Sequence, residues 1–160
     1  MPPERRAELL QSLSVDEACA LAGDWSFWAR EEQLAPEGDW RIWLFVGGRG
    51  AGKTRAGAEW ILERVRAGAM RRVALVGATY ADMRDVMVGG ESGLRTLGRG
   101  EGVSYLASKR QLHWPNGAMA QGFTAEEPDG LRGHQFDGAW FDALEGVLGL
   151  GALRVAVNKG

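Results

Sequence analysis

A glycine-rich loop between an apolar segment and a helical one restricts the fold of this chain more than any other feature. Residues Gly47–Thr54 read Gly-Gly-Arg-Gly-Ala-Gly-Lys-Thr, the pattern G-x-x-x-x-G-K-[ST], directly after the apolar run Trp43–Val46. From Thr54 to Ala67 apolar residues recur at helical spacing, so a helix N-terminus would point at the contents of the loop. This order predicts a buried strand over residues 43–46 and a phosphate-binding loop after it.

Each part of the loop has a chemical task in that prediction. The glycines let backbone N–H groups turn toward phosphate oxygens, the amine of Lys53 adds a positive charge, and the hydroxyl of Thr54 is a Mg²⁺ ligand. The alternative is a glycine-rich turn with an exposed lysine, which does not account for the order of strand, loop and helix. The residues expected to bind nucleotide are Gly47, Gly48, Arg49, Gly50, Ala51, Gly52, Lys53 and Thr54.

Composition sets limits on the class of protein. The 160 residues are 45% hydrophobic and 25% charged, which is ordinary for one soluble domain. A net charge of −2 gives no overall attraction to nucleic acid. The single cysteine, Cys19, excludes an internal disulfide framework, and no apolar run approaches the roughly 18 residues of a membrane span. We therefore expect a chain without a membrane segment, in a reducing compartment.

The alternation of strand and helix patterns predicts an α/β fold. We expect a mostly parallel sheet flanked by helices, plus a β-hairpin and an N-terminal helical arm. The arm is expected over residues 1–40, with Ser14 and Glu17 as a capping box, and the nucleotide-binding domain over 41–160. Helices are expected over residues 4–22 in two pieces, 53–67 and 81–88; strands over 72–78, 103–106, 111–114, 118–123, 136–141 and 154–157; and loops over 89–102 and 124–134.

A second carboxylate is expected at the end of a neighbouring strand, because nucleotide loops of this type hold Mg²⁺ with one. Asp142, directly after the apolar segment Gly138–Phe141, is the best candidate. Its alternative is an aspartate that ends a strand and only caps a turn. Thr54 and Asp142 are therefore the predicted metal ligands.

Several longer stretches resemble one family, the ATPase domain of large terminase subunits, which are motors that package DNA into tailed-phage heads and gene transfer agent particles. The likeness around the loop is far more specific than its eight-residue motif. The stretches follow the family order within residues 25–142, and they are Asp39–Leu44, Gly47–Trp60, Asp82–Met87, Ala125–Gly133 and Phe136–Asp142.

The resemblance implies ATP and Mg²⁺ as ligands and roles for particular residues. Arg49 resembles the loop arginine of the family, which contacts the γ-phosphate, so Arg49 and Lys53 are the expected catalytic residues. Arg132 resembles an arginine that approaches the phosphates, with a surface role as the alternative. Trp40 and Trp43 lie where an adenine-contacting segment could sit, with core packing as the alternative. The implied partners are double-stranded DNA, the portal, the small terminase subunit and further copies in a ring, in the cytoplasm of a bacterial host cell.

The chain departs from the family pattern after Asp142. The family places a glutamate there as general base, whereas this chain has Ala143, whose methyl group cannot accept a proton. Glu145 could substitute only if the backbone bulged. Residues 143–152 are also short for a crossover between parallel strands, and the strand at 154–157 lacks the threonines of the family's coupling motif. With no nuclease domain after it, we expect a truncated ATPase domain with weak or absent hydrolysis.

Two other functions stay open from the sequence. The chain could be a non-catalytic nucleotide-binding module that regulates a full-length terminase, which the alanine at position 143 favours. It could also be a small-molecule kinase, although the terminase-like stretches have no role in one. A metal hydrolase is disfavoured, because the chain has two histidines and no Cys/His ligand spacing.

Overall fold

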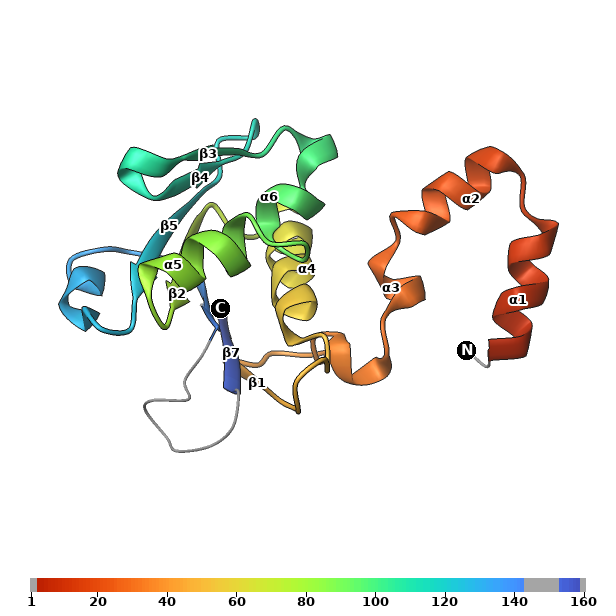
Figure 1. Cartoon of the computed structure of the whole chain (residues 1–160), viewed down its shortest axis with the longest axis horizontal. Helices are drawn as coiled ribbons and strands as arrows, with labels where there is room; N and C mark the ends of the chain where they lie inside the picture. Colours follow the sequence, from red (N-terminus) through yellow and green to blue (C-terminus); the bar gives the residue numbers. More distant parts are fainter. Residues whose placement is uncertain (1–2, 143–152, 159–160) are drawn as a thin grey trace. The chain divides into compact units, whose positions relative to one another are not determined.

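The computed structural model describes residues 3–142 and 153–158 (Figure 1). The chain divides into two compact units, Met1–Glu31 and Glu32–Gly160. The expected arm, residues 1–40, extends beyond the first of these. None of the described helices is long and apolar enough to cross a membrane.

The first unit is helical; the sequence predicts its helices over residues 4–22 in two pieces, but no helix over residues 25–28. It contains α1 (Pro3–Ser12), α2 (Val15–Ala22) and α3 (Trp25–Trp28). The predicted capping box is confirmed: the Ser14 hydroxyl accepts a hydrogen bond from the Glu17 N–H, and the Glu17 carboxylate accepts one from the Ser14 N–H. None of the three helices buries a residue fully.

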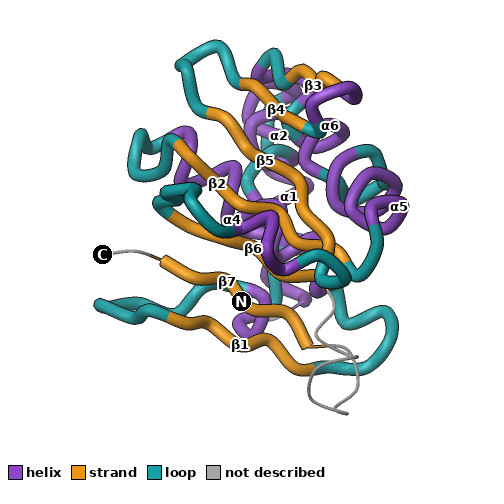
Figure 2. Tube along the Cα trace, turned by 90° about the vertical axis from the view of Figure 1, so that its left-hand side faces the viewer, coloured by secondary structure: helices purple, strands orange, loops and turns teal. Residues whose placement is uncertain are grey.

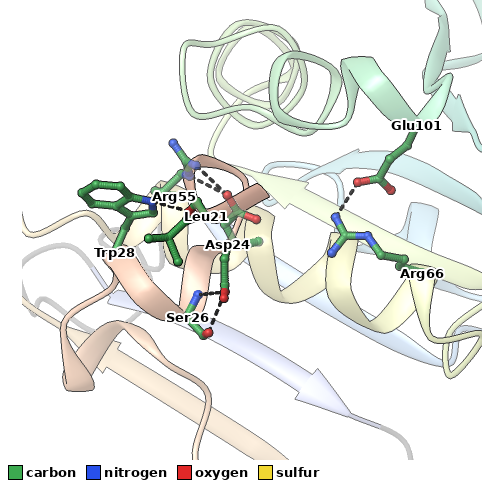
Figure 3. Close-up of polar contacts among 8 residues, drawn as sticks. Leu21, Asp24, Ser26, Trp28, Arg55, Arg66 and Glu101 are labelled. Carbon is green, nitrogen blue, oxygen red and sulfur yellow. Dashed lines mark hydrogen bonds and ion pairs between the residues drawn. The ribbon is translucent and has the colours of Figure 1, made fainter. Parts of the chain in front are cut away.

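Side-chain bonds fix the turns of this first unit. The Asp24 carboxylate caps α3 by accepting from the Ser26 N–H at 2.9 Å. The Trp28 indole donates to the Leu21 carbonyl at 2.8 Å, so α3 is tied back to α2 (Figure 3). These bonds stabilise an arm that has little core of its own.

The second unit is built on a seven-stranded sheet with the strand order β1-β7-β6-β2-β5-β4-β3. Figure 2 shows the strands side by side, from β1 at one edge of the sheet to β3 at the other. They are β1 (Ile42–Val46), β2 (Arg72–Gly77), β3 (Ser104–Leu106), β4 (Gln111–His113), β5 (Met119–Thr124), β6 (Gly138–Asp142) and β7 (Leu153–Asn158). The predicted α/β class is confirmed.

The expectation of a mostly parallel sheet is wrong. The parallel pairs of the described sheet are β2 with β5 and β2 with β6. All other neighbours in the described sheet are antiparallel, including β7 against both β1 and β6. The physical reason at β7 is the connection, because residues 143–152 are few for a parallel crossover but enough for a strand to turn back.

The expectation of a buried strand at residues 43–46 is also wrong. β1 is the last strand at one edge of the described sheet, and its residues alternate between exposed and half-buried. Ile42, Leu44 and Val46 are 64%, 50% and 59% exposed, whereas Trp43 and Phe45 are half-buried. A continuous apolar run predicts a strand that is covered on both faces of the sheet. In β1, the face that carries Ile42, Leu44 and Val46 is not covered by any described residue.

The main core lies between the sheet and helix α4 (Lys53–Arg66). Ile61 and Leu62 of α4 are buried together with Leu75 of β2 and Trp140 of β6. A smaller apolar cluster around Phe123 includes side chains from β2 and β5, with Phe136 packed against it. The predicted strand over 72–78 is confirmed, since all but the first residue of β2 are buried.

The segment after β2 is helical as predicted, with one difference. Thr79 and Asp82 form a second capping box at α5 (Tyr80–Asp82), and η2 (Met83–Val88) continues it as a π-helix. The expected loops contain short helices too: α6 (Leu94–Leu97), η3 (Arg99–Glu101) and η5 (Pro128–Leu131). Two further short helices lie where the sequence predicts none: η1 (Glu31–Gln33) before β1, and η4 (Ala107–Lys109) before β4.

The predicted hairpin is confirmed, and its turn reaches α4. Strands β4 and β5 pair antiparallel around the turn Pro115–Gly117. The Asn116 side chain donates to the Val65 carbonyl in the last turn of α4 at 3.0 Å, in addition to the bond that this carbonyl accepts from the Gly68 N–H. Arg66, in the same turn, forms an ion pair with Glu101 of η3 (Figure 3).

Candidate functional site: the Gly47–Thr54 loop

The loop 47–52 connects the end of β1 to the start of α4, the order that the sequence predicts. Two of its glycines, Gly50 and Gly52, have φ angles of 80° and 79°. These angles lie in the left-handed region, where a side chain would be strained. Where successive residues alternate between right-handed and left-handed backbone conformations, their N–H groups point to one side and form a concave site for anions.

Lys53 folds back onto the loop that precedes it. Its ammonium group donates to the Gly47 carbonyl at 2.6 Å and to the Gly48 carbonyl at 2.8 Å. The residue is only 7% exposed. Lysine is almost never buried unless it is paired, and here the two carbonyls are its partners. Lys53 therefore holds the two ends of the loop together and places its charge at the loop itself.

Gln33 is a loop contact that the sequence reasoning missed. It is 8% exposed, and its side-chain amide donates to the Ala51 carbonyl at 3.2 Å. It also lies against Gly52, because a Cβ built there would stand 2.1 Å from the Gln33 Nε2. A glutamine in an irregular segment gives no periodic signal, so nothing in the sequence pattern indicates this contact.

Asp142 and the loop lie on the same side of the sheet, the side at which strands β6 and β1 end. It is the last residue of β6, 6% exposed, and it pairs in register with Arg154 of β7. Phe45, near the end of β1, pairs with the same residue from the other side. Strand β7 lies between β1 and β6, and adjacent strands are about 4.8 Å apart, so the ends of β1 and β6 are about 10 Å apart. The loop, which follows β1, therefore begins close to Asp142.

Strands β2 and β5, which run parallel to β6, also end on this side of the sheet. Gly77 of β2 is in register with both Asp142 of β6 and Thr124 of β5. The buried Thr124 hydroxyl donates to the Ala78 carbonyl at 2.8 Å, which ties the segments that follow β5 and β2. The carboxyl ends of three parallel strands thus meet beside the loop, where ligands bind in open α/β sheets.

The two arginines expected near the phosphates are both exposed. Arg49 projects from the loop, with an exposed side chain. Arg132 follows η5 and is ion-paired with Asp129 at 3.0 Å, and both side chains are almost fully exposed. The structure therefore places Arg49 on the loop and Arg132 on the surface of the segment between β5 and β6.

A hydrogen bond ties that segment to helix α5. The Tyr80 hydroxyl donates to the Glu127 carboxylate at 3.1 Å, and the Arg110 guanidinium lies 3.4 Å from the centroid of the Tyr80 ring. Burial raises the pKa of Tyr80, and its bond to Glu127 raises it further, while Arg110 opposes the rise. Arg110 has a φ of 55°, unusual for a residue with a side chain.

Trp40 and Trp43 pack against the main core rather than standing free. Trp40 lies 5.8 Å from Trp60 and 6.3 Å from Trp43, measured between ring centroids. The core-packing alternative therefore describes both residues. Two positions raised by the sequence, Ala143 and Glu145, lie outside the described residues.

One of the comparisons with known proteins identifies a family. The family model for the N-terminal region of the terminase large subunit, T4-like virus type, matches residues 44–144, well over half of the chain. No curated protein and no solved structure matches the chain. The matched residues begin in β1, include the whole loop, and extend past Asp142. The chain therefore belongs to this family of phage DNA-packaging proteins, the large terminase subunits of the T4-like virus type.

Proposed function

We propose that the second unit binds ATP with Mg²⁺ through the Gly47–Thr54 loop and Asp142, as the nucleotide-binding part of a DNA-packaging terminase. The observation that carries the proposal is the Lys53 ammonium group, which is buried against the Gly47 and Gly48 carbonyls at the N-terminus of α4. A buried cation, a helix N-terminus and two left-handed glycines are together the elements of a phosphate site.

The residues of the site would divide the work of binding. Backbone N–H groups of the loop would bind the phosphate oxygens, and Lys53 would offset their charge. The exposed guanidinium of Arg49 would contact the terminal phosphate, because its planar fork matches two phosphate oxygens. The adenine base is proposed from the family and not from the loop, whose contacts are to phosphates.

Mg²⁺ suits the oxygen donors that Thr54 and Asp142 offer beside the loop. The Thr54 hydroxyl and the Asp142 carboxylate supply oxygen ligands, which this ion prefers. No group of three or more His, Cys, Asp or Glu side chains gathers into a metal site among the described residues. Mg²⁺ usually binds through one or two carboxylates plus substrate phosphates, so one carboxylate beside a phosphate loop suits it. When bound, the ion would neutralise charge on the phosphates.

Hydrolysis is expected to be weak, because Ala143 follows Asp142 where a general base is needed. Loss of a positioned base typically costs about 10²- to 10⁴-fold in rate. This observation favours a second candidate, a non-catalytic nucleotide-binding regulator of a full-length terminase of the tailed-phage or gene-transfer-agent kind. Double-stranded DNA, the portal, the small terminase subunit and a ring of copies would be the partners of the motor.

Titration with a fluorescent ATP analogue, with and without Mg²⁺, tests the binding proposal. We expect Mg²⁺-dependent binding by the chain and its loss in Lys53→Ala. Lys109→Ala, which removes an exposed lysine from the η4 turn, is the matched control and should bind like the unaltered chain. Equal binding by Lys53→Ala would overturn the proposal.

A gain-of-function variant separates the two candidates. Ala143→Glu restores a carboxylate beside Asp142, and Ala143→Gln matches its size without a base. If the chain is a disabled motor ATPase, only the glutamate variant should raise the steady-state ATPase rate, by about 10²-fold or more. No increase over Ala143→Gln would favour the non-catalytic regulator, whose own test is competition with an intact terminase in a packaging assay.

A further inference from the structure

We propose that strand β1 is a self-complementary interface, through which two copies of this chain join their sheets edge to edge around a two-fold axis. The inference goes beyond the proposed function and does not depend on nucleotide binding. Figure 2 shows β1 at one edge of the sheet, beside β7. Among the described strands β7 alone pairs with β1, so the outer edge of β1 offers backbone N–H and C=O groups to a further strand.

The residues of β1 favour the addition of a strand at that edge. Proteins protect the edges of their sheets with charged residues, with proline or with very short edge strands. The sequence of β1, Ile-Trp-Leu-Phe-Val, contains neither a charge nor a proline. At the opposite edge, β3 has three residues, whereas β1 has five. Of the two edges of the described sheet, β1 is therefore the longer template.

The order of side chains along β1 suits a two-fold axis through Leu44. In an antiparallel pair centred there, Leu44 lies opposite Leu44 of the second copy, and Ile42 lies opposite Val46. Trp43 then lies opposite Phe45, twice in the pair. Aliphatic residues meet aliphatic residues on one face of the joined sheet, and aromatic residues meet aromatic residues on the other. Aromatic pairs directly across two strands are among the contacts that stabilise a sheet.

Other registers fit less well. A centre at Trp43 or at Phe45 would pair only three of the five residues of β1 with β1 of the second copy. A slip by a single residue would place the exposed aliphatic face of one copy beside the half-buried aromatic face of the other. With the centre at Leu44, all five residues pair and the two exposed faces are continuous.

The proposed pair closes after two copies and leaves both loops accessible. A two-fold contact uses the same surface on both copies, so no further copy can add at β1. The Gly47–Thr54 loop follows Val46 directly, and in an antiparallel pair the two loops leave at opposite ends of the joined strands. Stable interfaces commonly use about 20–30 residues a side, more than one strand supplies. We therefore expect a weak dimer whose share rises with protein concentration.

Cysteine cross-linking tests both the surface and the register. Every variant carries Cys19→Ser, which removes the single native thiol. Leu44→Cys places two thiols directly opposite each other, with the Cα atoms about 4.5–5.5 Å apart, within the range of a disulfide. Ile42→Cys places them four residues apart along the strand, roughly 14 Å, which a disulfide does not span. We expect mild oxidation to link Leu44→Cys at least about tenfold faster than Ile42→Cys.

Two further samples identify the pairing. A mixture of Ile42→Cys and Val46→Cys should link, because these positions lie opposite each other in the proposed pair, although neither variant should link quickly alone. Leu106→Cys is the matched control, since Leu106 is exposed in the strand at the opposite edge of the described sheet. Its rate measures linking by random collision, and Ile42→Cys alone should match it. Sedimentation velocity of the unaltered chain should show the dimer directly.

Three results would overturn the proposal. Equally fast linking of Leu44→Cys and Ile42→Cys would indicate parallel or unordered association. Linking of Leu44→Cys no faster than that of Leu106→Cys, with a chain that sediments as a monomer at all concentrations, would mean that β1 does not pair. A dimer in sedimentation without fast linking of Leu44→Cys would place the contact on another surface. None of these measurements uses a nucleotide, so they decide about β1 whether or not the loop binds one.

Discussion

The indole of Trp140 lies directly against the backbone of Gly57, since a Cβ built on Gly57 would stand 2.4 Å from the Trp140 Nε1. Trp140 is in β6, two residues before Asp142, and Gly57 is in α4, four residues after Lys53. The bare α-carbon therefore lets the helix that carries Lys53 approach the strand that carries Asp142. The distance between the two halves of the proposed site depends on this contact.

Gly57→Ala should destabilise the chain although alanine is the better helix former. The gain in helix propensity is about 1 kcal/mol, whereas overpacking a buried site costs about 1–3 kcal/mol. Trp140 is fully buried and its rigid ring has no flexible end that could move aside. We expect a net loss of free energy of unfolding of up to about 2 kcal/mol in urea titrations.

Two controls separate the clash from the helix effect. Gly100→Ala adds the same methyl group where no atom lies within 4 Å, so it should not lose stability. In a double-mutant cycle, Trp140→Phe should relieve the clash, and Gly57→Ala should then cost less than it does alone. Additive effects of the two substitutions would contradict the packing argument.

Asn116 should matter for stability because its side chain joins the end of α4 to the turn between β4 and β5. Its amide donates to the Val65 carbonyl and its oxygen accepts from the Ala118 N–H, both at 3.0 Å. Asn116→Ala removes both bonds, each worth about 0.5–1.5 kcal/mol. Asn116→Asp keeps the acceptor, loses the donor, and places a negative charge at the helix C-terminus, which is unfavourable.

We therefore expect both substitutions to lower the free energy of unfolding measured in urea, by about 1–3 kcal/mol for alanine. Ser108→Ala, a change at an exposed polar residue in the η4 turn, serves as the control and should stay within about 0.5 kcal/mol. A fully stable Asn116→Asp would show that the bond to Val65 contributes nothing.

The capping box of α2 should titrate at low pH. The hydrogen bonds of Ser14, first from its backbone N–H and then from its hydroxyl, lower the pKa of Glu17 below its ordinary value of 4.5. Because the pKa is lowered in the folded state, the stabilisation is present above pH 4.5 and is lost as the pH falls through the folded-state pKa. The N-terminus of α2 should therefore loosen only below pH 4.5.

An NMR titration of the Glu17 side chain checks this expectation. Its midpoint should lie below 4.5 and rise only part of the way in Ser14→Ala, because the backbone bond remains. Ser12→Ala removes a hydroxyl that donates to the Leu9 carbonyl and should leave the midpoint unchanged. A Glu17 midpoint at or above 4.5 in the unaltered chain would contradict the capping geometry.

The sequence predicted the local elements well, because their signals are local. The serine and glutamate at positions 14 and 17 form the capping box that their spacing predicts. The apolar run of β2 is buried on both faces, and the Pro-Asn-Gly turn closes a hairpin. Each of these depends on side-chain chemistry within a few residues.

Features set by distant parts of the chain were not predictable in this way. The run at β1 looked buried, but its neighbours depend on where β7 is placed, and β7 is antiparallel. The loop residues were identified from their motif, whereas Gln33 was not, because its partner Ala51 is 18 residues away. The pairing of Tyr80 with Glu127 depends on the ends of two strands that meet only in the folded sheet.

The exposed face of β1 leads to a last prediction, about self-association. β1 is the terminal strand of the described sheet, and its five residues carry no charge. An uncharged edge strand with exposed apolar side chains is a template for pairing with another chain. Leu44→Lys places a charge in the middle of this strand at a residue that is already half exposed, so we expect less aggregation by light scattering and a stability change within about 0.5 kcal/mol.

A second edge strand tells a local effect from a general effect of charge. Leu106 of β3 is also exposed and lies in the strand at the opposite end of the described sheet. Leu106→Lys adds the same charge, but β3 has three residues and offers a shorter template. Aggregation should fall clearly more for Leu44→Lys than for Leu106→Lys; equal reductions would point to net charge as the cause, and no reduction at Leu44 would mean that β1 does not pair between chains.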